Sequence, residues 1–136
     1  MDTETFKAQM EELPLMLRWV RKHWIHQPEA FYTIEVALEE ALVNIIQYAY
    51  GPNGGAIELT LRIEPQSHIE IGIRDWGKPF NPLLEGPKVD PTTSLEGREV
   101  GGLGIFLMSK LVDDVLYEWD GISNWLVFIK RFSQKP

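Results

Sequence analysis

The spacing of apolar residues predicts two helices in the first half of the chain. Over residues 11–27, apolar side chains recur every three or four positions, which is the spacing of one helix face. Pro14 falls in the first turn of this segment, where a missing N–H group is tolerated. A second helix is predicted from residue 28 or 29 to Tyr50, because Gly51 and Pro52 follow directly and such residues end helices.

Alternation of apolar and polar residues predicts strands in the rest of the chain. It covers residues 56–64 and 68–74, which a short turn joins into a hairpin. Two further strands are predicted over residues 114–119 and 125–132, across an Asp-Gly turn. Residues 3–9 are expected to add a short strand at the edge.

The order of these segments predicts an α+β fold. Residues 75–100 are rich in helix and strand breakers and are predicted to form a long loop, and residues 104–111 a third helix. The resulting order suggests a two-layer α/β sandwich, in which helices cover one face of a mixed, mostly antiparallel sheet. A chain of 136 residues fits a single domain, residues 1–136.

Composition and charge limit the cellular compartments and the partners that we expect for this chain. The formal charge of −7 disfavours nonspecific attraction to nucleic acid or anionic lipid. The chain has no cysteine, which excludes disulfides, a thiol nucleophile and a thiolate metal site. It shows no apolar stretch of membrane-spanning length and no secretion signal at its start. We therefore expect a cytoplasmic protein with no membrane and no direct nucleic-acid partner.

The second predicted helix carries an acid and an amide on one face. Glu40 and Asn44 are four positions apart, so they lie about 40° apart around the helix axis. The Asn44 carbonyl oxygen is a suitable ligand for Mg²⁺, and Glu40 could position or deprotonate an attacking group. Glu39 lies one step further round and is expected to be solvated. The alternative is a helix with one exposed polar stripe, since such short patterns recur by chance.

A second motif follows the strand over residues 68–74. The Asp75 carboxylate emerges at a sheet edge, where it can accept a hydrogen bond from an exocyclic amine such as that of adenine. Gly77 would let the backbone approach a planar ring closely. Lys78 is a weaker candidate for contacting phosphate. The alternative is an ordinary turn, for which Asp-x-Gly is common.

A third motif is a glycine-rich segment before the third predicted helix. Gly101, Gly102, Leu103 and Gly104 would expose backbone N–H groups at a helix start, which favours anions such as phosphate. Arg98, just before them, is a plausible phosphate cation. The segment is neither a Walker loop nor a dinucleotide-binding loop. The alternative is a flexible linker into the helix.

In this order, the three motifs resemble the boxes of the GHKL ATPase/kinase superfamily, the group of gyrase, histidine kinases and mismatch-repair ATPases. Glu-x-x-x-Asn at 40–44 matches the N box, Asp-x-Gly at 75–77 the first glycine box, and Gly-Leu-Gly at 102–104 the second. The longer segments resemble anti-sigma-factor serine/threonine kinases of the RsbW/SpoIIAB type, over nearly the whole chain: residues 39–50, 74–82 and 101–108.

This resemblance implies a Bergerat-type sandwich that binds ATP and Mg²⁺ and phosphorylates a serine of a small anti-sigma-factor antagonist. It also implies a sigma factor as partner and a homodimer. By position, Asn44 would hold Mg²⁺, Glu40 would be the catalytic base, and Asp75 would bind adenine. Gly77 and the 101–104 segment would line the base and the phosphates.

Three functions stay open at this point. The first is a kinase that also sequesters a sigma factor, and the second is a nucleotide-gated binding switch with little or no kinase activity. The third is a separated catalytic domain of a histidine kinase, but neither His23 nor His26 has the acidic neighbour that phospho-acceptor sites favour. Tyr48 and Phe106 stand where relatives carry histidine, and this bears on kinase rate and partner choice.

Overall fold

The structure is a computed structural model, and it describes residues 1–24, 28–82 and 110–132. Its elements in chain order are β1 (Asp2–Lys7), a 3₁₀ turn η1 (Met10–Glu12), α1 (Leu13–His23), α2 (Pro28–Tyr48), β2 (Ala56–Glu64), β3 (His68–Asp75), β4 (Asp114–Trp119) and β5 (Asn124–Arg131).

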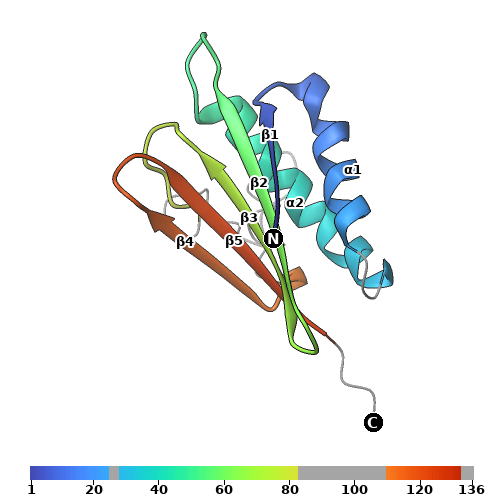
Figure 1. Cartoon of the computed structure of the whole chain (residues 1–136). Coiled ribbons are helices and arrows are strands. Elements are labelled where there is room, and N and C mark those ends of the chain that lie inside the picture. The colour runs from blue at the N-terminus through green and yellow to red at the C-terminus, as the bar shows by residue number, and fades with distance from the viewer. Residues whose placement is uncertain (25–27, 83–109, 133–136) are drawn as a thin grey trace, which may run out of the picture.

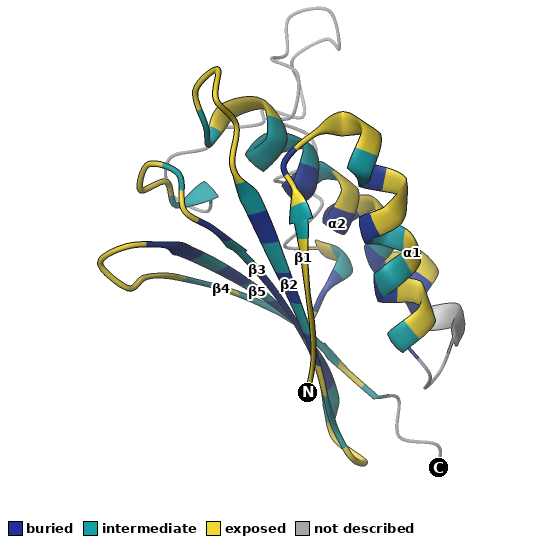
Figure 2. Cartoon of the chain, turned by 45° about the horizontal axis from the view of Figure 1, so that its top comes forward, coloured by how far each residue is buried: buried dark blue, intermediate teal, exposed yellow. Residues whose placement is uncertain are grey.

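The described strands form one five-stranded sheet in the order β1-β2-β3-β5-β4 (Figure 1). Every neighbouring pair in it is antiparallel, which makes this part of the sheet simpler than the mixed sheet that the sequence allowed. Both helices lie on the same face of the sheet (Figures 1 and 2). The predicted two-layer α+β architecture is therefore confirmed.

Alternating side chains build the core between the sheet and the helices. The strands β2, β3 and β5 contribute buried residues at alternating positions, and each helix contributes one apolar stripe (Figure 2). The innermost of these side chains, all under 2% exposed, include Met16 of α1, Phe31, Ile34, Leu38 and Leu42 of α2, Ile57, Leu59 and Leu61 of β2, Ile69, Ile71 and Ile73 of β3, and Phe128 of β5. Trp24 also belongs to this core, at 4% exposure, and Trp19 packs against it.

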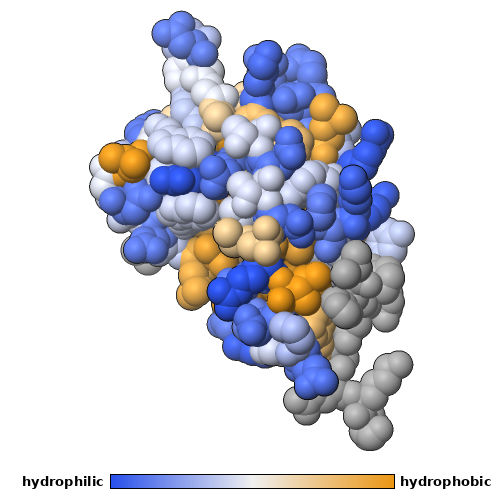
Figure 3. Space-filling view, in the orientation of Figure 1, coloured by the Kyte–Doolittle hydropathy of each residue, from blue (hydrophilic) through white to orange (hydrophobic). Residues whose placement is uncertain are grey.

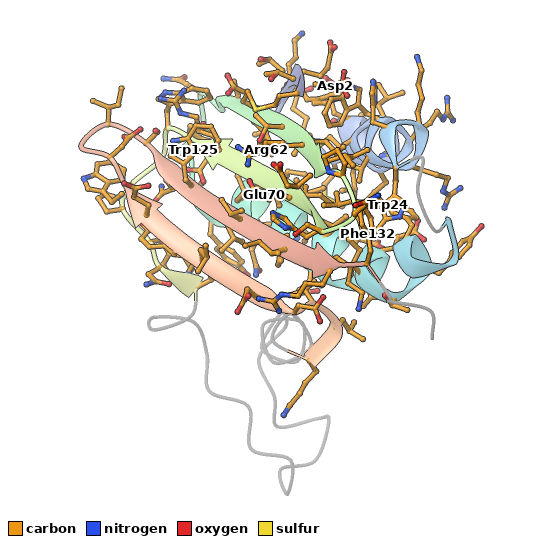
Figure 4. All side chains as sticks on the ribbon, turned by 60° about the horizontal axis from the view of Figure 1, so that its bottom comes forward. Asp2, Trp24, Arg62, Glu70, Trp125 and Phe132 are labelled. Atoms are coloured by element: carbon orange, nitrogen blue, oxygen red, sulfur yellow. The ribbon has the colours of Figure 1, made fainter. Side chains whose placement is uncertain are left out.

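The opposite face of the sheet has no described helix on it. Arg62 and Glu70 are register partners on β2 and β3, and both project from this open face together with Trp125 (Figure 4). The face is largely hydrophilic, apart from apolar atoms that gather over β4 and β5 (Figure 3). Residues at odd positions of β3 point the other way, toward the helices, and Asp75 is the last of them.

The predicted boundaries hold for most elements. The strands β2 and β4 begin and end where the alternation predicted, and β3 is one residue longer because Asp75 still pairs with Ile57. The first α-helix is shorter than predicted, because a 3₁₀ turn precedes Leu13 and the helix ends at His23. The third predicted helix lies outside the described residues except for positions 110 and 111, which have helical backbone.

The second helix ends at Tyr48 rather than at Tyr50. The backbone N–H of Ala49 still bonds to the Ile45 carbonyl at 3.0 Å, but Tyr50 turns away to contact β2. A turn with Gly54 at φ +69° then leads into β2, and that left-handed conformation suits glycine. Within the described part of the chain, no helix is long and apolar enough to cross a membrane.

Candidate functional site

Asp75 lies at the C-terminal end of β3, on the helix side of the sheet. Its side chain is only 4% exposed, and it follows three buried isoleucines on the same face of the strand. A carboxylate in such a place needs hydrogen-bond donors, because burial without them is costly. One donor comes from the loop that follows β3 and the other from the neighbouring strand β5.

Two donors hold one oxygen of this carboxylate. The backbone N–H of Gly77 donates to Asp75 Oδ1 at 2.9 Å, and the side-chain amide of Asn124 donates to the same atom at 3.0 Å. The other oxygen, Oδ2, receives no hydrogen bond from the residues that the structure describes. Burial raises the pKa of Asp75, and these two hydrogen bonds act against that rise. The carboxylate is thus oriented through its Oδ1 atom.

Asn124 is the second half of this arrangement, and the sequence reading missed it. It is the register partner of Asp75 on β5 and is 5% exposed. Its amide also donates to the Lys78 carbonyl at 2.9 Å, and its oxygen accepts from the Phe80 N–H at 3.0 Å and from the Tyr117 hydroxyl. The predicted strand began at residue 125, so Asn124 fell in the predicted turn region, where an asparagine is common.

Gly77 brings the loop after β3 against the end of α2. A Cβ atom at this position would overlap the carbonyl oxygen of Ala49, which is backbone and cannot move aside. The predicted role of Gly77 was close approach to a ring, whereas the observed close approach is to the helix that carries Glu40 and Asn44. The described structure therefore brings the Asp75–Gly77 motif against the C-terminal end of the helix that carries Glu40 and Asn44.

Glu40 and Asn44 share one flank of α2, as their spacing predicted. The opposite flank packs on α1, where Glu35 pairs with Arg21 at 2.9 Å and Phe31 stacks edge-on against Trp24. At about 100° per residue, Glu40 and Asn44 lie roughly 140–180° around the axis from those contacts. The helix α1 contacts β2, which lies near one edge of the sheet. The flank of α2 that carries Glu40 and Asn44 points away from α1, and therefore toward β3 and β5.

The two polar residues of this flank are partly buried and have no described partner. Burial raises the pKa of Glu40, and the neighbouring Glu39 charge raises it further. Glu39 itself is exposed, as expected. Neither Glu40 nor Asn44 makes a side-chain hydrogen bond or ion pair with the described residues.

The remaining predicted site residues divide into two groups. Lys78 is exposed in the loop after Gly77, and its ammonium forms no ion pair within residues 1–24, 28–82 and 110–132. Arg98, Gly101, Gly102, Leu103 and Gly104 lie outside the described residues.

The side chains of the described residues suit a metal ion that takes few of its ligands from the protein. The described ranges contain no group of three or more histidine and acidic side chains that could cage a metal. A single amide oxygen such as that of Asn44 fits Mg²⁺ best, since Mg²⁺ commonly takes one or two protein ligands and completes its shell with waters and phosphates.

Comparison with known proteins agrees with this fold. The profile of the histidine kinase-like ATPase domain family matches residues 6–130, so the chain belongs to that family. Within it, the chain groups with proteins named serine-protein kinase RsbW. The one from Listeria innocua is 31% identical over 112 residues, which cover 79% of this chain and 69% of the relative. The one from Oceanobacillus iheyensis is 37% identical over 93 residues, which cover 64% and 57%.

Solved structures show the same fold at low sequence identity. The histidine kinase domain of a blue-light activated histidine kinase from Erythrobacter litoralis superposes with a TM-score of 0.56 at 13% identity, covering 87% of this chain and 60% of that one. A mycobacterial sensor histidine kinase, MprB, gives a TM-score of 0.53 at 18% identity and covers 94% and 97%. Membership of the histidine kinase-like ATPase domain family implies that the chain uses ATP.

Proposed function

We propose that this chain is an ATP- and Mg²⁺-dependent serine/threonine protein kinase whose substrate is a small anti-sigma-factor antagonist. In this proposal it also binds a sigma factor, as a cytoplasmic homodimer, and so controls transcription. The family and the RsbW-named relatives support kinase chemistry. The resemblance of the three motifs to anti-sigma-factor kinases supports the choice of partners.

The observation that carries the proposal is the state of Asp75. Its Oδ1 is fixed by the Gly77 N–H and the Asn124 amide, and its Oδ2 is left for an external donor. An amine such as the 6-amino group of adenine supplies that donor, and a hydrogen bond to a charged acceptor is worth about 1.5–3 kcal/mol. Asp75 is therefore assigned to base recognition.

Asn44 and Glu40 are assigned to the reacting end of the nucleotide. The Asn44 carbonyl oxygen would hold Mg²⁺, which when bound neutralises charge on the phosphates. Glu40 would accept the proton of the attacking serine hydroxyl at its carboxylate. Its raised pKa suits that role, because a base works best when its pKa approaches the operating pH. Lys78, Arg98 and the 101–104 segment are proposed to line the phosphates.

The second candidate function is a nucleotide-gated binding switch with little or no kinase activity. Tyr48 favours this candidate, because it is 60% exposed on α2 at a position where the family resemblance leads us to expect histidine. In that case the site binds ATP, and only partner affinity depends on it.

Phosphate transfer to the antagonist separates the two functions. The purified chain is incubated with γ-labelled ATP, Mg²⁺ and the antagonist protein encoded nearest to it, and labelled antagonist is measured. The same assay is run with Glu40→Gln, Asn44→Ala and Glu39→Gln. Glu39→Gln is the matched control, because it removes an exposed carboxylate one position away.

The kinase proposal expects labelled antagonist from the wild type and from Glu39→Gln, and at least 100-fold less from Glu40→Gln. ATP binding without transfer by the wild type would leave only the switch. Absence of ATP binding would overturn both functions.

A further inference from the structure

One tyrosine connects the two halves of the described site. Tyr50 follows the end of α2, and its hydroxyl donates to the Ala56 carbonyl at 2.5 Å, at the start of β2. The same hydroxyl accepts from the backbone N–H of Trp76 at 2.8 Å, between Asp75 and Gly77. The ends of α2 and β3 and the start of β2 meet at one end of the sheet (Figure 1).

The Tyr50 ring packs closely against the chain at Gly55. A Cβ atom on Gly55 would overlap the ring, so the chain passes close against it. The phenol is partly buried, and burial raises its pKa, with the Asp75 charge adding to the rise. The hydroxyl is therefore protonated at neutral pH and can donate to Ala56 while accepting from Trp76.

We propose that Tyr50 is a positioning residue that sets where the Asp75 carboxylate stands relative to Glu40 and Asn44, and thereby determines selectivity for the adenine base. The inference rests on the proposed ATP site. Asp75 reads one end of the nucleotide and the α2 residues serve the other, so a fixed spacing between loop and helix is needed for both to engage together. Gly77 allows the loop after β3 to approach the end of α2 closely. Tyr50 holds the loop in that position through its hydrogen bond with the Trp76 N–H.

The sequence offers a matched pair of variants. Tyr50→Phe removes the bridging hydroxyl and keeps the ring against Gly55. Tyr48→Phe removes a hydroxyl from the same helix end, but that side chain is 60% exposed and makes no described hydrogen bond. Both changes are chemically identical, so any difference between them comes from the bridge.

The test compares ATP with inosine triphosphate, which carries a carbonyl where adenine carries its amino group. Affinities of wild type, Tyr50→Phe and Tyr48→Phe for both nucleotides are measured by titration calorimetry with Mg²⁺ present. We expect Tyr50→Phe to weaken ATP binding by about tenfold, the size of one lost hydrogen bond, and to weaken binding of inosine triphosphate much less. The preference for ATP therefore falls, and Tyr48→Phe leaves it unchanged.

A purely structural role gives a different result. If Tyr50 only stabilises the fold, both nucleotides lose affinity in proportion and their ratio stays at the wild-type value, which would overturn the inference. If Tyr50→Phe does not fold, Gly55→Ala decides instead, because it displaces the ring and should lower the same ratio. Failure of the wild type to bind ATP would overturn the proposed function itself, and this inference with it.

Discussion

The side-chain amide of Asn124 donates to Asp75 Oδ1 at 3.0 Å, across the register pair that these two residues form on β5 and β3. The amide thus connects the ends of two central strands with the loop after β3, through the Lys78 carbonyl and the Phe80 N–H. Because every contact involves a buried or partly buried atom, the arrangement is sensitive to small chemical changes.

The first prediction concerns the charge at position 124. Asn124→Asp keeps the shape of the side chain but places a second carboxylate against Asp75. Two carboxylates at this distance cannot both ionise cheaply, so one pKa of the pair rises strongly. We expect the variant to lose about 2–4 kcal/mol of unfolding free energy at pH 8 and less at pH 5, where the pair shares a proton.

Chemical denaturation at the two pH values measures this difference. Asn53→Asp is the control, because it adds the same charge in an exposed turn. Equal destabilisation by Asn124→Asp at pH 5 and pH 8 would contradict the proposed contact between the carboxylates.

A second prediction separates ligand binding from stability at Asp75. In Asp75→Asn, the amide oxygen can still accept from Gly77 and Asn124, while the amide nitrogen takes the place of Oδ2. The nitrogen is a donor, and it faces the donor of the base. We expect ATP affinity to fall at least 100-fold, from the lost charged hydrogen bond and the new mismatch, while the thermal midpoint changes by a few degrees at most. Calorimetric titration and thermal unfolding on the same samples test this, and retained ATP binding would remove Asp75 from base recognition.

The sequence predicted the sheet well, because most of its strands show a simple alternation of apolar and polar residues. One face of β2 carries the apolar residues Ile57, Leu59 and Leu61, so that face must be the buried one, and Ile69–Ile73 repeat the pattern on β3. The edge strand β1 was placed to within two residues at each end, although it is mostly polar and exposed.

The site was predicted only in part, for a physical reason. Asp75 and Gly77 carry their chemistry in local sequence, whereas Asn124 and Tyr50 act through partners 49 and 26 positions away. A long-range hydrogen bond leaves no periodic trace in the sequence. Asn124 lay just before the strand predicted over residues 125–132, in the turn region, and nothing in the pattern distinguished Tyr50 from Tyr48.

The third prediction concerns Glu40 and pH. The pKa of Glu40 in the folded chain lies above its ordinary value of 4.5, so the folded state binds this proton more tightly than the unfolded state does. The charged side chain therefore costs stability as the pH rises from about 4.5 through the folded pKa. Glu40→Gln removes that cost, and we expect it to be at least as stable as the wild type at pH 7 while phosphate transfer is lost.

The stability gain should disappear below about pH 4, where Glu40 is protonated in both states. Thermal unfolding across pH 4–8 provides the measurement, and Glu39→Gln, at an exposed position, should follow the wild-type curve more closely. A clear loss of stability in Glu40→Gln at pH 7 would indicate that Glu40 has a structural partner, and would weaken its assignment as a base.

The last prediction tests the contact between the loop and α2. Gly77→Ala places a methyl group on the Ala49 carbonyl oxygen, and since both are backbone-anchored, the loop must move. Overpacking of this kind costs about 1–3 kcal/mol. The displaced loop carries the Gly77 N–H, which donates to Asp75 Oδ1. The carboxylate therefore loses its fixed orientation, and we expect ATP affinity to fall by more than tenfold. Gly51→Ala is the control, because nothing lies within 4 Å of a Cβ there. If Gly77→Ala bound ATP as tightly as Gly51→Ala, the spacing between loop and helix would not govern nucleotide binding, and Asp75 would have to act independently of α2.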